Sequence, residues 1–332
     1  MANQIKATVF IPVYNGENDH LEETLSALYN QKTDFNWNVL ITDSGSSDNS
    51  VPIIRKFADK YGNLTLKQID KSEYSHGGTR QMAAEISDGE YMVYLSQDAV
   101  PYNQNWLNEM LAPFEISEKV VAVLARQKPR DYCFPAMKYD INAVFEEQGT
   151  PDAVTIWTRT VSEQVGMYTK ESFYSDVCSA APRLFLVNEI GYRPVKYSED
   201  YEYGKDIIDA GYYKAYNGRA IVEHSNDVLL KEYKKRIFDE TYNVRLNSGA
   251  PESQMSLWFI FRQSLKGILK DIPKILRDKD YSLKKKLYWS VVNPLFHIEK
   301  WRGIRLANMI KLDEDISSFS LEHQGKKKKI VY

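Results

Sequence analysis

Short apolar runs alternate with helix-spaced segments over residues 1–125 of the chain. The unbroken β-branched and apolar runs predict buried strands at residues 5–13, 37–42, 65–69, 91–95 and 119–125. The segments between them show helical apolar spacing or follow capping residues, and they predict helices at residues 21–29, 51–61, 81–87 and 105–115. This alternation builds right-handed crossovers, so it favours an α/β fold with a mostly parallel, Rossmann-like sheet flanked by helices.

The regular alternation ends near residue 126. Helical patches and short strands then mix with loops, at residues 139–147, 154–158, 183–190, 201–210 and 220–224. Amphipathic helices follow at residues 231–246, 255–276 and 283–292. We therefore predict a domain at 1–229, with a nucleotide-binding half (1–125) and an acceptor half (126–229), and a helical C-terminal region at 230–332.

Polar residues collect at the carboxyl ends of three predicted strands, as Asn15, Asp43 with Asp48, and Asp98. The carboxyl ends of parallel strands meet at one edge of a sheet, where open α/β sheets bind their ligands. The first strand is not followed by G-x-G-x-x-G, and the chain has no G-x-x-x-x-G-K-[ST]. Both absences argue against a dinucleotide enzyme and a P-loop NTPase.

The net charge of −2 hides an uneven distribution of charge. Residues 230–332 hold 22 Lys and Arg against 12 Asp and Glu, whereas residues 1–229 hold 21 against 33. Trp258, Phe261 and Trp301 stand among the basic residues, a composition typical of a helix on anionic lipid. An equally open alternative is a packing domain or a homodimer interface with a solvated basic face. No nucleic-acid recognition motif accompanies the charge, so we expect no nucleic-acid partner.

Two further features bear on the compartment. Cys133 and Cys178 are the only cysteines, which gives no disulfide framework and fits a reducing compartment. The N-terminus lacks a signal-peptide pattern, and no stretch reaches the roughly 18 apolar residues that span a bilayer. We therefore expect a cytoplasmic protein, at most peripheral on the inner face of the plasma membrane.

Several short motifs carry a resemblance to a known family. Ile11-Pro-Val-Tyr-Asn15, Asp43-Ser-Gly-Ser-Ser-Asp48, Gln97-Asp98 and Glu199-Asp200 stand in the order and spacing of family-2 inverting glycosyltransferases with the GT-A fold, which the chain resembles. Within that family it is similar to bacterial rhamnosyltransferases, through Tyr74-Ser-His-Gly-Gly-Thr-Arg80, Ser96-Gln-Asp-Ala99, Ser175-Asp-Val-Cys-Ser-Ala180, Ser198-Glu-Asp200 and His224-Ser225. The last hundred residues resemble the C-terminal helices of streptococcal cell-wall rhamnan enzymes. The resemblance covers about residues 5–230.

The strand ends and one helix start are expected to bind a nucleotide sugar. An Asp at a strand end, with Gly45 permitting a tight turn, can accept the N3–H of a pyrimidine base, and the resemblance implies this role for Asp43; the alternative is a helix-capping turn. The glycines after His76 let the backbone approach phosphate at a helix N-terminus, and Arg80 adds a bidentate donor. The alternative is a capped helix with a surface Arg, and a His76 that is only a loop residue. The predicted nucleotide-sugar site comprises Pro12, Tyr14, Asn15, Asp43, Ser46, His76, Gly77, Arg80, Gln97 and Asp98.

A divalent cation is expected at Asp98. Most relatives have two carboxylates around this position, whereas here Gln97 and Ala99 flank a single one. A cation then needs Asp98, the diphosphate oxygens, water and His224, and such a partly hydrated, oxygen-rich set suits Mg²⁺ or Mn²⁺. The alternative is that Asp98 is a turn residue before Pro101.

The reaction requires a base that deprotonates the attacking hydroxyl of the acceptor. The transition state is oxocarbenium-like, and direct attack inverts the configuration. The resemblance implies that Asp200 is this base and that Glu199 orients the acceptor or supports Asp200, although spacing does not separate two neighbours. Acidic residues in a first helical turn are also favoured by the helix dipole alone. Asp176 and Ser179 are expected to shape the acceptor and sugar pocket.

The resemblance implies one function, and two alternatives stay open. The implied function is transfer of L-rhamnose from dTDP-β-L-rhamnose to a lipid-linked saccharide during assembly of a cell-wall rhamnose polysaccharide. The first alternative keeps the fold and uses a UDP-hexose. The second is a non-catalytic scaffold that binds a membrane or assembly partners through the C-terminal region.

Overall fold

The chain forms two units in the computed structural model, which describes residues 4–160, 169–195, 197–226, 228–312 and 314–321. The first unit is Met1–Lys128 with Ala143–His224, and the second is Pro129–Asn142 with Ser225–Tyr332. The second unit thus includes a segment before residue 143 in addition to the C-terminal helices that the hydrophobic pattern predicts.

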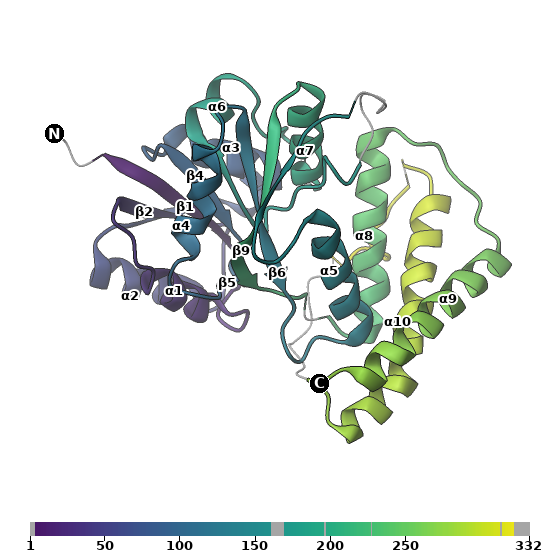
Figure 1. Ribbon diagram of the computed structural model, residues 1–332. Helices are drawn as coiled ribbons and strands as arrows, with labels where there is room; N and C mark the ends of the chain where they lie inside the picture. Colours follow the sequence, from purple (N-terminus) through teal and green to yellow (C-terminus); the bar gives the residue numbers. More distant parts are fainter. Residues whose placement is uncertain (1–3, 161–168, 196, 227, 313, 322–332) are drawn as a thin grey trace. The chain divides into compact units, whose positions relative to one another are not determined.

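The first half of the sheet has the parallel order that the sequence predicts. Strands β1 (Ile5–Val13), β2 (Asn36–Asp43), β3 (Leu64–Gln68) and β4 (Tyr91–Leu95) lie in the order β3-β2-β1-β4 and are all parallel (Figure 1). Three helices connect these strands: α1 (Leu21–Tyr29), α2 (Ser50–Tyr61) and α3 (His76–Ile86). The register pairs Val13 with Asp43, so β1 and β2 end side by side.

The second half of the sheet is mixed. Strand β8 (Cys178–Pro182) lies between β4 and β6 (Val120–Lys128) and is antiparallel to both. Strand β9 (Tyr213–Glu223) is parallel to β6, and the short strands β5 (Val100–Pro101) and β7 (Val154–Trp157) are antiparallel to β9. The expected α/β architecture is confirmed, whereas the parallel arrangement applies to the first half alone. The sequence predicted a loop where β8 lies, because Cys-Ser-Ala-Ala-Pro has little intrinsic strand preference and its place between two strands decides its conformation.

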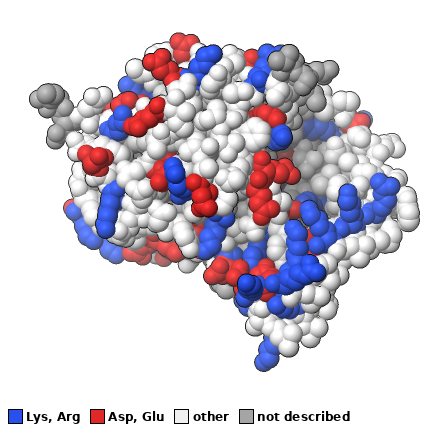
Figure 2. Space-filling view, viewed as in Figure 1, with Lys and Arg blue, Asp and Glu red and all other residues white. Residues whose placement is uncertain are grey.

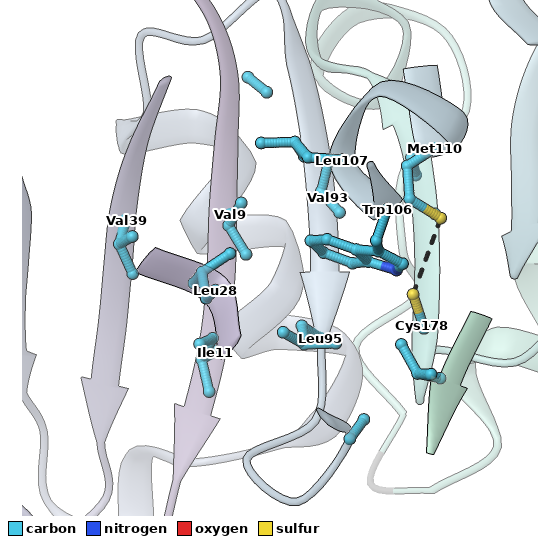
Figure 3. Packing of buried hydrophobic residues seen from close by; sticks show 14 of the residues in the cluster. Val9, Ile11, Leu28, Val39, Val93, Leu95, Trp106, Leu107, Met110 and Cys178 are labelled. Atoms are coloured by element: carbon cyan, nitrogen blue, oxygen red, sulfur yellow. Dashed lines mark hydrogen bonds between the residues drawn. The ribbon is translucent and has the colours of Figure 1, made fainter. Parts of the chain in front are cut away.

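Alternate strand residues bury one face of the sheet against α1, α2 and α4 (Trp106–Leu111). The period of two along each strand produces this alternation, and Trp106 fills the space above β4 with its side chain fully buried (Figure 3). The residues that β1, β2 and β4 contribute to this core are Ala7, Val9, Ile11, Val13, Val39, Ile41, Val93 and Leu95.

The other face of the sheet carries the aromatic contacts that position α3. Phe10 and Tyr94 pack edge to face at 5.9 Å, and Tyr94 packs against Tyr192 at 5.2 Å. The Tyr94 hydroxyl donates a hydrogen bond of 3.2 Å to the carbonyl of Arg80 in α3. Helices α6 (Arg183–Asn188) and α7 (Glu199–Asp209) complete the first unit together with the end of α5 (Pro135–Gln148).

The second unit is built on α8 (Leu230–Ser248), α9 (Leu257–Arg277) and α10 (Leu283–Met309). Phe134 stacks on Phe296 at 4.0 Å in its core. Asp271 of α9 is buried and accepts hydrogen bonds from Asn293 and His297 of α10, at 3.0 and 2.7 Å. Helix α10 runs on through Pro294 to Met309, beyond the end that the sequence predicted at residue 292. None of the described helices combines the length and apolar content that crossing a bilayer requires.

We expect Trp106→Ala to lower the free energy of unfolding by about 3–5 kcal/mol, because it leaves a cavity above β4 that the packed strands cannot fill. Urea titration followed by circular dichroism measures this change. Leu184→Ala is the control, since the Leu184 side chain is 59% exposed and its loss leaves no cavity. An equal effect of both substitutions contradicts the central packing role of Trp106.

Candidate active site

The first group of predicted residues forms a hydrogen-bonded turn where β1 and β2 end. The Asp43 carboxylate is buried and accepts from the backbone N–H groups of Gly45 and Ser46, at 3.3 Å each. Asn15 has a left-handed backbone (φ 49°), and its N–H donates to Ser46 Oγ at 2.9 Å. For a base to reach Asp43, the turn that covers this carboxylate has to move aside, so the base-binding role of Asp43 stays a prediction.

Gln97 connects the end of β4 to the segment after β1. The Gln97 Oε1 accepts a hydrogen bond from the Tyr14 N–H at 2.9 Å. The Gln97 Nε2 donates hydrogen bonds to Tyr14 O at 3.3 Å and to Asp19 Oδ2 at 3.1 Å. The Tyr14 ring is exposed, and the ammonium of Lys71 lies 4.5 Å from its centre. Pro12 pairs with Thr42 at the end of β1. The Gln97 amide therefore orients the loop that carries the exposed Tyr14.

The start of α3 is occupied by protein contacts. The Gly77 N–H donates to Val195 O at 3.3 Å, and the Gly78 N–H donates to Ser75 Oγ at 3.1 Å. A Cβ on Gly77 would lie 1.8 Å from Arg193 O, so glycine is required there for close approach of residues 193–195. His76 Nδ1 lies 3.2 Å from the Tyr74 hydroxyl. These backbone donors already have partners within the chain, and the phosphate site expected here stays a prediction.

Arg80 faces a cluster of carboxylates. Its Nη1 lies 2.7 Å from Glu199 Oε1, and its Nε lies 3.2 Å from Asp176 Oδ2, with all three side chains buried. Burial alone lowers the pKa of the guanidinium, but Glu199 and Asp176 outweigh it and raise that pKa above its ordinary value. Arg80 is thus a buried cation between two carboxylates and not the surface Arg of the alternative interpretation, and its role toward phosphate stays a prediction.

Asp176 and Ser179 are brought together at the start of β8. The Asp176 Oδ1 accepts from Ser179 Oγ at 2.5 Å and from the Tyr192 hydroxyl at 2.8 Å. Burial raises the pKa of Asp176, and the charge of Arg80 acts in the opposite direction. The carboxylate is therefore held rigidly by groups from three segments of the chain.

Asp200 lies beside this cluster in the first turn of α7 and is partly exposed. Its Oδ2 accepts from the Asp176 N–H at 3.3 Å, and its Oδ1 accepts from the Tyr201 N–H at 2.9 Å. The preceding Ser198 has a left-handed backbone (φ 61°), which is strained for a non-glycine residue and turns the chain sharply into α7. Burial, followed by the charges of Glu199 and Asp176, raises the pKa of Asp200 well above its ordinary value, against the lowering effect of Arg80. The carboxylate is therefore more basic than an exposed one.

Asp98 and His224 face each other at the ends of β4 and β9. Asp98 Oδ2 lies 3.5 Å from His224 Nε2. His224 Nδ1 lies 3.1 Å from Gln127 Oε1, and Gln127 Nε2 donates to Ser175 Oγ at 3.1 Å. An amide oxygen accepts a hydrogen bond, so Nδ1 carries a proton and Nε2 is the ring nitrogen on the side of Asp98. No group of three or more His, Cys, Asp or Glu side chains suited to a metal occurs in the described part of the chain.

The sequence did not predict three hydrogen-bonding residues of the site, namely Tyr192, Gln127 and Ser175. Tyr192 orients Asp176, while Gln127 orients His224 through its contact with Ser175. Tyr192 and Gln127 lie outside the recognised motifs, and their roles depend on contacts between segments 16 to 97 positions apart in the sequence. No local pattern could have identified them.

Residues 8–176 match the family model described as Glycosyl transferase family 2, which spans just over half of the 332 residues. The chain belongs to glycosyl transferase family 2. This family-2 chain is 26% identical over 242 residues to "O-antigen chain rhamnosyltransferase RfbN" of Salmonella typhimurium, covering 71% of each chain. It is 30% identical over 239 residues to "O-antigen chain rhamnosyltransferase WbaN" of Salmonella anatum, covering 70% of each chain.

The fold of this family-2 protein is also found among solved structures. It matches a "Mannosyltransferase PcManGT from Pyrobaculum calidifontis in complex with GDP-Man and Mn2+" with a TM-score of 0.54 and 16% identity, over 92% of this chain and 85% of the other. The full TarS structure of S. aureus matches with a TM-score of 0.51 and 17% identity, over 92% of this chain and 55% of the other. The expected GT-A fold is confirmed.

We expect activity to fall as the pH drops through the raised pKa of Asp200, above the value of about 3.9 of an ordinary Asp. Glu199→Gln removes a charge that raises this pKa, so the acidic limb of the kcat/KM profile moves to lower pH. Glu189→Gln, an exposed carboxylate in the same unit, is the control and leaves the limb in place. A limb that stays unmoved in Glu199→Gln contradicts the electrostatic coupling, and complete loss of activity there makes Glu199 the base.

Proposed function

We propose that this family-2 glycosyltransferase is an inverting α-L-rhamnosyltransferase that uses dTDP-β-L-rhamnose and Asp200 as its general base. The observation that carries the proposal is the partly exposed Asp200 carboxylate, held by two backbone N–H groups, with a raised pKa. The rhamnosyltransferase relatives support the choice of sugar. We further propose that the acceptor is a lipid-linked saccharide and that the product is part of a rhamnose-containing cell-wall polysaccharide.

In the proposed reaction, Asp200 takes the proton of an acceptor hydroxyl. The acceptor oxygen forms a bond to C1 of rhamnose as the bond from C1 to the diphosphate oxygen breaks, and dTDP leaves. Attack on the face opposite the leaving group converts the β-linked donor to an α-linked product. Arg80 holds Glu199 and Asp176 in place, so the base keeps its position while it gains and loses a proton.

The nucleotide is assigned to the ends of β1, β2 and β4. We propose that Asp43 accepts the N3–H of the pyrimidine and that the exposed Tyr14 borders the base or ribose. Asn15, Ser46 and Gln97 fix the two loops through backbone hydrogen bonds. GDP-Man bound to the mannosyltransferase with the same fold supports a nucleotide sugar as the donor.

A divalent cation fits the Asp98–His224 pair. The Asp98 carboxylate lies 3.5 Å from His224 Nε2, and Gln127 holds Nδ1 by a hydrogen bond, the arrangement that is usual for a His that binds a metal through its other nitrogen. Two protein ligands suit Mg²⁺ or Mn²⁺, which take their remaining ligands from diphosphate and water. When bound, the cation neutralises charge on the leaving dTDP. Mn²⁺ in the mannosyltransferase structure supports a divalent ion.

The two alternative functions, a UDP-hexose transferase and a non-catalytic scaffold, require different features of the site. A UDP-hexose transferase keeps every residue above and differs in the shape of the sugar pocket. A non-catalytic scaffold has no need for an oriented, partly exposed Asp200 beside a buried cation, so the cluster argues against it.

We expect dTDP release only from dTDP-β-L-rhamnose in a panel of nucleotide sugars supplied with a lipid-linked saccharide. Asp200→Asn should lower kcat by about 10²–10⁴-fold, because the amide cannot accept the proton. Asp209→Asn, at the far end of the same helix, is the matched control and keeps the rate. Preference for a UDP-sugar contradicts the rhamnosyl donor and favours the first alternative. Absence of turnover with every donor, together with vesicle binding, favours the scaffold.

We expect EDTA to lower the rate, with recovery on addition of Mg²⁺ or Mn²⁺. Asp98→Asn should raise the half-saturating cation concentration by about 10–100-fold, because it removes the charged ligand. Asp34→Asn changes an exposed carboxylate at the other end of β2 and serves as the control. An undiminished rate in EDTA removes the metal from the mechanism.

A further inference from the structure

Helix α9 turns an apolar stripe away from the core of the second unit. Ile260, Ser264, Asp271 and Ile275 are buried and recur at helical spacing on one side. Large apolar side chains recur on the opposite side, with exposures from 41% for Leu265 to 71% for Trp258 and 72% for Leu257. The exposed members are Leu257, Trp258, Phe261, Leu265, Leu269 and Leu276.

Helix α10 repeats this arrangement. Trp289, Asn293, Phe296 and His297 are buried on one side. Leu283 is 83% exposed and Leu287 is 71% exposed on the other side. The exposed members are Leu283, Leu287, Tyr288, Val291, Leu295 and Ile298, and together with those of α9 we call them the apolar surface. Monomeric soluble proteins seldom leave so many large apolar side chains exposed along adjacent helices, so this surface has an occupant in the cell.

Basic side chains border the apolar surface. Arg262, Lys266, Lys270 and Arg277 lie along one side of α9, and Lys284, Lys285 and Lys286 open α10. Among the described residues, none of these seven side chains has an ion-pair partner. Figure 2 shows Lys and Arg side chains over α9 next to an uncharged surface. We call these seven residues the basic border.

The charges of α9 and α10 indicate which kind of partner binds the apolar surface. Helix α9 contains five Lys and Arg and one Asp, and α10 contains six Lys and Arg and one Glu. The Asp of α9 is buried Asp271, and Glu299 of α10 pairs with Arg302, so neither balances the border. In a two-fold dimer the same patch meets itself, and basic borders would then face each other. A partner with anionic groups above an apolar layer matches both features.

We propose that the apolar surface inserts into one leaflet of a bilayer that contains anionic lipid, with the basic border on the lipid phosphates. An amphipathic helix with a basic side and Trp, Phe and Leu on the other side lies in the plane of the interface. The 21 residues of α9 give an apolar stripe of roughly 30 Å along the surface. Neither helix has the composition to cross the bilayer. This inference stands whether or not the transferred sugar is rhamnose.

The test uses the full-length protein and two kinds of vesicle, one of phosphatidylcholine and one of equal parts phosphatidylcholine and phosphatidylglycerol. We expect co-sedimentation with the anionic vesicles, weakened by salt because the lipid charges are screened. Each Lys or Arg near an anionic surface adds about fivefold in partition coefficient, so changing Arg262, Lys266, Lys270 and Arg277 to Gln should lower binding by roughly several hundredfold.

A second variant tests the apolar contribution. Trp258→Ser, Leu265→Ser and Leu269→Ser combined should lower binding by at least about a hundredfold without lowering Tm, since all three side chains are exposed. Ile86→Ser, Ile116→Ser and Leu184→Ser combined form the matched control, because these residues are 52%, 55% and 59% exposed in the first unit. Arg55, Lys60, Lys67 and Lys119 changed to Gln form the matched control for charge.

Tryptophan fluorescence distinguishes insertion from loose adsorption. Trp258 is 71% exposed, so its emission should shift to the blue and be quenched by brominated lipid when anionic vesicles are added. Equal binding to both kinds of vesicle overturns the role of the basic border. No vesicle binding, with a dimer in sedimentation equilibrium that the Trp258, Leu265 and Leu269 substitutions dissociate, overturns the proposal in favour of a second copy. Turnover of a water-soluble acceptor reports separately on the proposed function, and both patch variants should retain it.

Discussion

The arrangement of the candidate site depends on one buried cation, the guanidinium of Arg80. Asp176 and Glu199 reach it from segments about a hundred residues further along the chain, and Asp200 lies next to both carboxylates. Three acidic side chains cannot share a buried space without a counter-charge, and removing one partner of such a pair costs about 3–5 kcal/mol. Arg80 therefore explains how a carboxylate of raised pKa persists at the start of α7, where the proposed reaction needs a base.

Chain connectivity links the other clusters to this one. Gln97 holds the loop after β1, and its neighbour Asp98 faces His224. Ser175 accepts a hydrogen bond from Gln127, which orients His224. The residue after Ser175, Asp176, forms an ion pair with Arg80. Two pairs of adjacent residues thus connect the proposed nucleotide turn, the proposed cation ligands and the proposed base. Insertion of β8 between β4 and β6 makes this possible, because it places Asp176 at the carboxyl edge of β4.

The two units differ in where they bury polar and apolar side chains. The first unit buries its apolar residues against a sheet and concentrates polar groups at the edge where β1, β2 and β4 end. The second unit buries a polar network, Asp271 with Asn293 and His297, and leaves large apolar side chains in contact with solvent on the other sides of the same helices. Burial of that network fixes which sides of α9 and α10 face each other, and so which sides stay free for a partner. Membership of glycosyl transferase family 2 accounts for the first unit, whereas the charge and the exposed apolar residues of the second require an explanation of their own.

The sequence by itself determined the order of strands and helices in residues 1–125. Each buried strand and each amphipathic helix there has its own local spacing of apolar residues. It also determined the family, through motifs whose residues are close together in the chain. The tertiary structure decided what the sequence placed wrongly or left open. Arg80 lies buried between two carboxylates, Gly77 accommodates residues 193–195, and Cys178–Pro182 is a strand. Each of these depends on contacts between residues far apart in the chain, and no local pattern encodes which distant charge or strand becomes the neighbour.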